Sequence, residues 1–294
     1  MLDKQQERAA RALVRYLDGI IKLKTAMRAF NEASPVLKMG NTKLKKGSAV
    51  IAGITLAPAD KSGVLGASGK PRTVCSFAEL AGCKNGCLDD EGRQGSPIKR
   101  NLRLARTLRW WHDRAAFLAD VERGLEILSE VSAQRPDHVV AFRANVLSDI
   151  RWEKHTLPRS GLSPVEFSTQ HGLRMYDYTK FPASIRPDMD GYHLTRSYSR
   201  HMGDEGAAET LKRGGRVAMI FDLTRKSAPL PTHWVAPDGT SYPVIDGDKN
   251  DERWEDPPGV IVGLRLKGSI PTRNGLREIG MVVSPTQHVA TAAA

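Results

Sequence analysis

Three cysteines lie close together in a chain that has no others. Cys75, Cys83 and Cys87 follow the spacing C-x7-C-x3-C within 294 residues. A disulfide would pair two of these thiols and leave the third over, which suits a secreted scaffold poorly. A metal or an iron–sulfur cluster can use all three, and three thiolates on a four-iron cluster leave one iron open for a substrate or cosubstrate. The spacing therefore predicts a metal or cluster site in this segment.

Zinc is the alternative metal for the cysteines. Structural zinc takes tetrahedral ligands, usually from closely spaced cysteine or histidine pairs. Cys83 and Cys87 fit such a pair, whereas the seven-residue gap before Cys83 does not, and the nearest histidine is His112. A zinc site would thus need a distant fourth ligand, which a three-cysteine cluster does not. Three packed thiols without a metal are the remaining interpretation, and the polar surroundings of the segment disfavour it.

Polar side chains stand at the ends of several predicted strands downstream of the cysteines. They are Asn145, Ser148, Asp149, Asp177, Ser197, Ser199 and Asp246. Turns favour these residue types, so each position alone has an ordinary structural explanation. Together they predict a polar pocket, with the carboxylates of Asp149, Asp177 and Asp246 as candidate catalytic groups.

The hydrophobic pattern predicts the elements that must position these residues. One long amphipathic helix is predicted over residues 4–31, ending before Ser34-Pro35. Predicted strands cover residues 48–57, 138–146, 173–179, 192–198, 216–223, 242–246 and 260–266, with a weaker one at 278–283. The clearest helices among them are predicted over residues 98–110, 113–133, 163–171 and 205–213.

Strands that alternate with helices indicate a mostly parallel sheet. We predict an α/β fold whose six to eight strands form a complete or partial β/α barrel, with an N-terminal helical extension. The predicted domains are the helix at 1–34, one barrel-like domain at 35–284 with the cysteine loop at 72–95, and a disordered tail at 285–294. A doubly wound open sheet is the competing architecture, and the absence of a Gly-rich phosphate turn disfavours it.

The predicted barrel places the cysteines beside the polar pocket. In such barrels the carboxyl ends of the strands carry the chemistry, and the cysteine loop directly follows the first strand. We therefore expect a cofactor in the active site rather than a remote structural metal.

Basic residues outnumber acidic ones, at 44 Lys and Arg against 33 Asp and Glu, for a formal net charge of +11. A run without acidic residues predicts contact with nucleic acid through Lys99, Arg100, Arg103, Arg106 and Arg109. A solvated helix face is the alternative interpretation. No apolar run is long enough to cross a membrane, and the charged N-terminus lacks the apolar core of a signal peptide. We therefore expect no membrane partner and a cytoplasmic location.

A three-cysteine loop after the first strand of a β/α barrel resembles the radical S-adenosylmethionine superfamily, although the cysteine spacing departs from the usual one. Over about residues 40–270 the chain also resembles bacteriophage and plasmid proteins of a gene product 88-like family. The shared features are a spread three-cysteine loop, a following basic helix, a strand end of the type RANVLSD and a strand of the type YDYTK.

The superfamily resemblance implies specific roles. The three cysteines would ligate a 4Fe–4S cluster whose open iron holds S-adenosylmethionine. Asn145, Ser148 and Asp149 would then lie near the methionine amino group, and Ser197 and Ser199 near the ribose. A phage-encoded protein would act in the host cytoplasm, and the positive charge makes nucleic acid or a nucleotide the expected substrate.

Two alternatives remain open. The first is a zinc-containing barrel enzyme of base exchange that resembles tRNA- or DNA-guanine transglycosylases. That chemistry needs an aspartate nucleophile and a second aspartate as acid or base, for which Asp149, Asp177, Asp222 and Asp246 are available. The cysteines lie early in this chain, whereas the zinc ligands of those enzymes lie late. The second alternative is a basic nucleic-acid-binding protein with a structural metal and no catalysis.

Overall fold

The computed structural model describes residues 2–39, 49–84, 87, 96–225 and 227–285. The chain divides into two compact units. Unit 1 comprises Met1–Val74, Asn101–Asp177 and Met189–His193, and unit 2 comprises Cys75–Arg100, Tyr178–Asp188 and Leu194–Ala294. The predicted boundary at residue 34 falls inside unit 1. The predicted tail beyond residue 285, and residues 85–86 and 88–95 of the cysteine loop, lie outside the described residues.

The N-terminal segment forms two helices, α1 (Lys4–Leu17) and α2 (Leu23–Ala33), so the prediction of one continuous helix is wrong. Asp3 caps α1 and forms a capping box with Gln6. The chain turns between the helices at Gly19, whose φ of 72° lies in the left-handed region that glycine adopts most easily. The apolar repeat continues across this turn, which is why periodicity alone suggests one helix.

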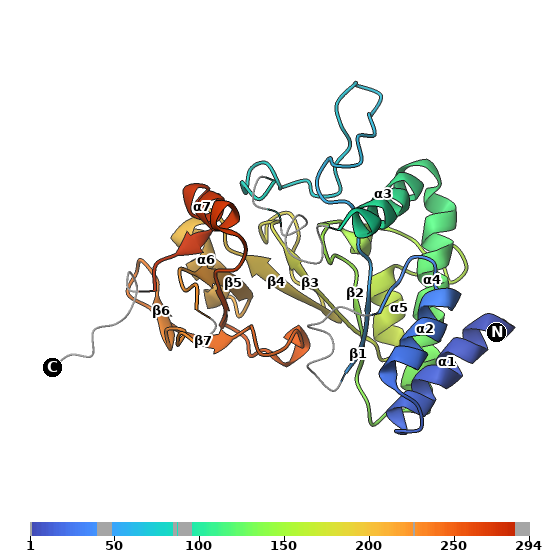
Figure 1. Cartoon of the computed structure of the whole chain (residues 1–294). Coiled ribbons are helices and arrows are strands. Elements are labelled where there is room, and N and C mark those ends of the chain that lie inside the picture. Colours follow the sequence, from blue (N-terminus) through green and yellow to red (C-terminus); the bar gives the residue numbers. More distant parts are fainter. Residues whose placement is uncertain (1, 40–48, 85–86, 88–95, 226, 286–294) are drawn as a thin grey trace. The chain divides into compact units, whose positions relative to one another are not determined.

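Three further helices agree with the predictions. They are α3 (Pro97–His112), α4 (Arg114–Gln134) and α5 (Pro164–Gln170). Asp113 caps α4 by accepting a hydrogen bond from the backbone N–H of Ala116, and Ser163 forms a capping box with Glu166 in α5. In unit 1, α1, α2 and α4 lie together (Figure 1), and Gln6 of α1 donates hydrogen bonds to α4.

The strands of unit 1 pair in parallel. They are β1 (Val50–Gly53), β2 (Val140–Arg143) and β3 (Arg174–Thr179), paired in the order β1–β2–β3; the last two residues of β3, Tyr178 and Thr179, are counted in unit 2. The connection from β1 to β2 runs through α3 and α4, and α5 connects β2 to β3. The core beside these strands includes a fully buried face of α4. That face carries Phe117, Val121, Leu125 and Leu128.

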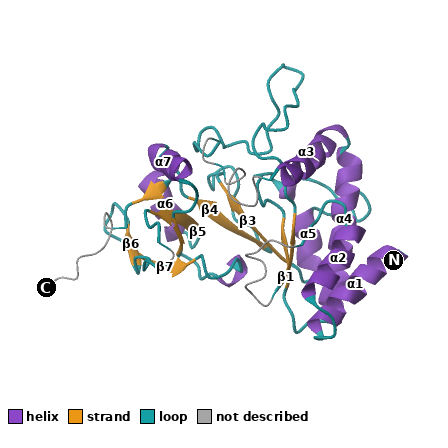
Figure 2. Ribbon diagram, viewed as in Figure 1, coloured by secondary structure: helices purple, strands orange, loops and turns teal. Residues whose placement is uncertain are grey.

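The strands of unit 2 are also mainly parallel. Strand β5 (Arg216–Phe221) pairs with β4 (Tyr192–Ser197), β8 (Ile261–Arg265) and the short β9 (Val282–Val283). On the other side of β8 lies β7 (Ser241–Asp246), to which β6 (His233–Val235) pairs antiparallel. Helices α6 (Gly203–Lys212) and α7 (Ile270–Glu278) complete the unit. Figure 2 shows the strands in orange and the helices in purple.

The α/β class and the mostly parallel pairing are confirmed, and closure of the strands into a barrel stays a prediction. Sequence patterns missed β6 and α7, and the weak strand predicted over 278–283 is reduced to β9 after the end of α7. Two short 3-10 helices, η4 (Trp152–Lys154) and η5 (Arg253–Glu255), follow β2 and β7. No helix in the described part of the chain combines the length and the apolar character that a bilayer span requires.

Gly124 allows α4 to pack closely on the segment after α2. A Cβ atom at this position would lie 2.8 Å from Cδ2 of Leu37 and 2.8 Å from Oγ of Ser34, closer than van der Waals contact. Gly275 in α7 is the opposite case, because a Cβ atom there would have no neighbour within 4 Å.

The first prediction concerns this contact. Gly124→Leu should lower the free energy of unfolding by about 1–3 kcal/mol, because the added side chain overpacks the contact with Leu37. Gly275→Leu is the matched control and should be neutral or slightly stabilising, since glycine is a poor helix former. Thermal unfolding followed by circular dichroism measures both. Equal effects of the two substitutions would contradict the proposed close packing.

Candidate functional site

The predicted site residues fall in different units of the structure. Four of them belong to unit 1, namely Asn145, Ser148, Asp149 and Asp177. Six belong to unit 2, namely Cys75, Cys83, Cys87, Ser197, Ser199 and Asp246. The basic residues of α3 are divided, with Lys99 and Arg100 in unit 2 and Arg103, Arg106 and Arg109 in unit 1.

In unit 1, Asn145 and Asp177 form the centre of a buried hydrogen-bond network. The backbone N–H of Asn145 donates to Oδ1 of Asp177 at 2.6 Å, and Nδ2 of Asn145 donates to Oδ2 at 3.1 Å. The hydroxyl of Tyr192 donates to the same Oδ2 at 2.6 Å. Asp177 has no exposed surface and Asn145 is only 2% exposed. The carboxylate of Asp177 is thus held away from solvent by hydrogen bonds from Asn145 and Tyr192.

The other side of the Asn145 amide organises the loop after β2. Its Oδ1 accepts hydrogen bonds from Oγ of Ser148, from the backbone N–H of Ile150 and from Nε1 of Trp152, at 2.8, 2.9 and 3.1 Å. Its Nδ2 also donates to the carbonyl of Ile150 at 2.9 Å. Asn145, Ser148 and Asp177 therefore lie together, and their contacts are those of a structural network.

Asp149 connects this loop to the start of the cysteine segment. Its backbone N–H donates to the carbonyl oxygen of Val74 at 2.8 Å, and Val74 directly precedes Cys75 in the chain. Asp149 is 7% exposed. The strand end that carries Asp149 and the residue before the first cysteine are thus neighbours in unit 1.

The three cysteines are partly buried, and none of them is in a disulfide among the described residues. Cys83 packs against an apolar cluster of Leu266, Leu276 and Met281, and its thiol donates weakly to the carbonyl of Ala78 at 3.6 Å. The donor chemistry fits a three-thiolate centre. Among the described residues, no group of three Cys, His, Asp or Glu side chains is gathered closely enough to bind a metal ion. The metal site stays a prediction.

A pocket lies in unit 2 at the carboxyl ends of β3 and β4. The end of β3 contributes Thr179, Lys180 and Phe181, the end of β4 contributes Arg196 and Ser197, and α6 with its preceding turn closes the far side. The cavity volume is about 230 Å³. Carboxyl ends of parallel strands are where ligands of α/β proteins commonly bind.

Phe77 of the cysteine segment packs beside this pocket. Its ring centroid lies 4.7 Å from that of Phe181 and 6.1 Å from that of His201, and both partners line the cavity. Phe77 follows Cys75 by two residues. The cysteine segment and the pocket are therefore neighbours within unit 2.

The most buried charged residue of the pocket lining is Arg196, whose side chain is only 1% exposed. One of its terminal nitrogens pairs with Asp188 at 2.6 Å, and the other donates to the carbonyl of Arg186 at 2.8 Å. Its Nε is buried and has no hydrogen-bond partner among the described residues. A buried guanidinium with an unused donor favours an anionic ligand, since such a donor is costly to leave unsatisfied.

The remaining lining is cationic and hydroxylated. Lys180 donates to the carbonyl oxygens of Ser197 and Tyr198, at 3.3 and 2.8 Å, which holds its ammonium group at the cavity. Arg213 also lines the pocket and pairs with Glu209. Ser197, a predicted site residue, belongs to the lining, whereas Ser199 is buried and its Oγ accepts from the backbone N–H of Met202.

Asp246 lies at the end of β7 in an ion-pair network. Arg265 donates to both of its carboxylate oxygens, at 2.9 and 3.1 Å, and also pairs with Asp248, which Lys267 contacts as well. The hydrogen bond from Arg265 lowers the pKa of Asp246 below its ordinary value. The carboxylate of Asp246 is therefore ionised, and the guanidinium of Arg265 balances its charge. These contacts are those of a structural ion pair. Its catalytic role stays a prediction.

The basic stripe on α3 is only partly exposed. Lys99 and Arg100 are exposed, Arg103 is 2% exposed, and Arg109 pairs with Asp120. Arg106 donates to the carbonyl of Thr55 at 3.4 Å, and burial lowers its pKa. Contact of this helix with nucleic acid stays a prediction that depends mainly on Lys99 and Arg100.

Sequence reasoning missed Arg196, Phe77 and Arg213. Arg196 could have been found from its position in β4. It is a charged residue two and four positions after Leu194 and Tyr192, which are buried on the same side of the strand. Phe77 and Arg213 carry no local signal, because their place beside the pocket depends on segments that are far apart in the chain.

A family model described as gene product 88 matches residues 35–279, which is most of the chain, and the chain therefore belongs to that family. The match includes the cysteines, the buried network and the pocket. No curated protein and no solved structure matches the chain.

The second prediction tests the Asn145 network. Asn145→Ala should lower the free energy of unfolding by at least about 2 kcal/mol, because it leaves buried partners such as Asp177 and Trp152 unsatisfied. Asn274→Ala in α7, where the side chain is exposed, is the control and should change stability by less than about 0.5 kcal/mol. Amide hydrogen exchange over residues 145–152 gives a local readout. Unchanged protection in N145A would contradict the assigned role.

Proposed function

We propose that this member of the gene product 88 family is a metal-dependent enzyme that binds a nucleotide-type anionic substrate in the pocket at the ends of β3 and β4. In this proposal, Cys75, Cys83 and Cys87 hold an iron–sulfur cluster next to the pocket. The observation that carries the proposal is the packing of Phe77, from the cysteine segment, on the pocket residue Phe181. Through this contact the segment with the three thiols lies beside the pocket whose lining contains the buried guanidinium of Arg196.

The charge of the pocket supports the substrate class. Its side chains include two arginines and a lysine against the single carboxylate of Glu209, which Arg213 already pairs. Guanidinium groups match the planar geometry of phosphate and carboxylate oxygens better than ammonium groups do. Hydroxyl groups of Thr179 and Ser197 add donors and acceptors for a sugar. A phosphorylated nucleoside combines these two features.

The cysteines support the cofactor by their chemistry and their exposure. Thiolates are the ligands that iron–sulfur clusters use, and partial exposure leaves room for a cosubstrate on an open iron. Because preformed metal sites are rare before the metal binds, the proposal includes assembly of the three thiolates when iron is supplied. When bound, a cluster with three protein ligands supplies electrons to a cosubstrate, for which S-adenosylmethionine is the proposed molecule.

The residues of this chain would bind and orient the substrate. Arg196 and Lys180 would hold its anionic group, and the ring of Phe77 would separate the pocket from solvent beside His201. The proposal also includes a barrel architecture, in which strand ends carry the site. Parallel pairing within each unit and a pocket at strand ends are what support it.

The third prediction tests the cofactor. Anaerobic reconstitution of the full chain with ferrous iron and sulfide should give a brown protein with broad visible absorption. Cys83→Ala should lose the colour and most of the iron, because one ligand is missing, while it keeps the apolar contact that Cys83 makes. Ser76→Ala, an exposed neighbour in the same segment, is the control and should retain both.

Two outcomes would contradict the iron–sulfur part of the proposal. One is an unchanged iron content in C83A. The other is a colourless protein with stoichiometric zinc, which would favour a zinc-containing base-exchange enzyme or a binding protein with a structural metal.

The fourth prediction tests the pocket. Adenosine monophosphate should bind more tightly than adenosine, and Arg196→Gln should weaken its binding by about 10-fold or more, as expected for the loss of a charge-assisted hydrogen bond. Calorimetric titration measures both ligands. Arg200→Gln is the control, because Arg200 is exposed and does not line the cavity.

Because Arg196 is buried and could affect folding, Arg213→Gln provides a second test at an exposed position of the same pocket. It should weaken nucleotide binding less than R196Q does. Equal affinities of adenosine and its monophosphate, with no effect of either substitution, would exclude this pocket as the nucleotide site.

A further inference from the structure

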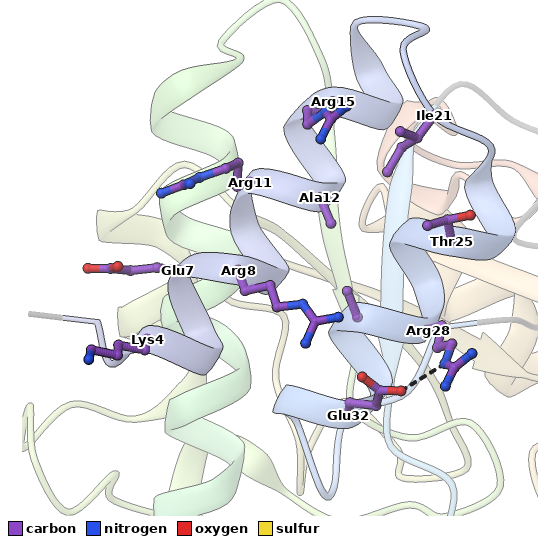
Figure 3. A pocket seen from close by; sticks show the side chains of 11 residues that line it. Lys4, Glu7, Arg8, Arg11, Ala12, Arg15, Ile21, Thr25, Arg28 and Glu32 are labelled. Atoms are coloured by element: carbon purple, nitrogen blue, oxygen red, sulfur yellow. Dashed lines mark hydrogen bonds and ion pairs between the residues drawn. The ribbon is translucent and has the colours of Figure 1, made fainter.

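A second and larger cavity lies in unit 1, in a groove between α1 and α2. Its volume is about 650 Å³, and residues of both helices line it (Figure 3). Five of the lining side chains are cationic, namely Lys4, Arg8, Arg11, Arg15 and Arg28, and only Glu7 and Glu32 are acidic. The α1–α2 groove precedes residues 35–279, so it lies outside the part of the chain that matches the family model.

The arginines of α1 are left without ion pairs, although acidic residues are close in sequence. Asp3 and Asp18, at the two ends of α1, pair with Arg123 and Arg135 instead. Arg8, Arg11 and Arg15 are exposed and form no ion pair with another described residue. Asp3 and Asp18 are thus used elsewhere. Because only Glu7 and Glu32 face the five cationic side chains of the lining, the groove keeps a net positive charge.

The ion pair inside the groove, between Arg28 and Glu32, is weak. Arg28 and Glu32 are bonded at 2.9 Å, with side chains that are 83% and 45% exposed. An exposed pair one helical turn apart contributes little to stability, so a ligand anion can replace Glu32 at Arg28. Figure 3 shows Arg8 extending from α1 toward this pair, while Lys4, Glu7 and Arg11 extend from the other side of α1.

We propose that the α1–α2 groove binds the phosphodiester backbone of nucleic acid through Arg8, Arg15 and Arg28. This site is independent of the pocket in unit 2 and of the cysteines. In this proposal the chain binds nucleic acid in the α1–α2 groove and, separately, a small nucleotide-type ligand in the pocket of unit 2.

The spacing of the arginines fits a row of phosphates. Arg8 and Arg15 are seven residues apart on α1, which corresponds to about 10 Å along a helix axis. Each strand of a nucleic-acid duplex presents one phosphate about every 3.4 Å of its axis, so this distance spans about three phosphates. Arg28 adds a third guanidinium from the opposite wall of the groove.

An acidic protein fits the groove less well than nucleic acid does. Protein interfaces gain most of their affinity from large apolar or aromatic anchors in pockets. The uncharged lining consists of Ala12, Ile21, Thr25 and Ala29, which offers no deep apolar site. A groove rich in guanidinium groups and poor in large apolar side chains instead favours a ligand that binds mainly through its negative charges.

The experiment uses the full chain with the substitutions Arg8→Gln, Arg15→Gln and Arg28→Gln combined. Fluorescence anisotropy measures the affinity for a labelled oligonucleotide, single-stranded and as a duplex, over a series of salt concentrations. The variant should bind at least about 10-fold more weakly, and the slope of log affinity against log salt should decrease by about 2–3, since each lost phosphate contact reduces it by about 0.9.

A control variant removes the same charge elsewhere, by Arg174→Gln, Arg200→Gln and Lys212→Gln, all at exposed positions outside the groove. It should retain most of the affinity and the slope. Circular dichroism should show both variants folded, because every substituted side chain is exposed. Comparison of the single-stranded and the duplex oligonucleotide shows which of them loses affinity in the groove variant, and this identifies the form of nucleic acid that the groove binds.

Three results would overturn the proposal. The control variant could lose as much affinity as the groove variant, which would indicate that net charge alone is responsible. The groove variant could bind both forms as the unchanged chain does. Polyglutamate of equal charge could displace the oligonucleotide as well as unlabelled nucleic acid does, which would point to an acidic protein partner. None of these results depends on the cofactor or on the pocket in unit 2.

Discussion

The hydrogen bonds between Asn145 and Asp177 join the loop after β2 to the neighbouring strand β3 inside unit 1. A carboxylate without exposed surface is tolerated only when its oxygens receive strong hydrogen bonds, and here Asn145 and Tyr192 supply them. The opposite end of the Asn145 amide then determines the path of the loop by receiving the indole N–H of Trp152. Because Asp149 in this loop bonds to Val74, the same network also positions the residue before the first cysteine.

Polar residues at the strand ends therefore have two different uses. Asp177 and Asp246 are saturated by hydrogen bonds or by an arginine, and Ser199 holds the start of α6. Arg196 and Ser197, by contrast, line a cavity. The same types of residue at similar positions thus serve packing in one place and ligand binding in another. The chemistry that this pocket offers is cationic, and this is why an anionic substrate is the proposal that its lining supports.

The pairing of charges also decides which basic residues can meet a partner. On α3, burial and the ion pair with Asp120 remove most of an uninterrupted basic run from the surface. At the two ends of α1, by contrast, the acidic residues Asp3 and Asp18 pair with Arg123 of α4 and with Arg135 after it. In this protein, the uninterrupted basic run of α3 therefore leaves fewer exposed cationic side chains for a partner than the mixed sequence of α1 does.

Most helices and strands could be predicted, because their apolar spacing and caps such as Asp113 and Ser163 are local. The turn at Gly19 escaped prediction, since the apolar repeat continues across it, and so did β6, a short strand that exists through pairing with β7. The sequence by itself determined the α/β class, the isolated cysteine segment and the positive charge, since these depend on composition and local pattern. Only the tertiary structure decided that Asp177 is buried and hydrogen-bonded, that Arg196 keeps an unused donor among the described residues, and that Arg8 and Arg15 form no ion pair within that part of the chain. Burial and ion pairing depend on contacts between residues far apart in the chain, and the spacing of residues along the sequence does not predict these contacts.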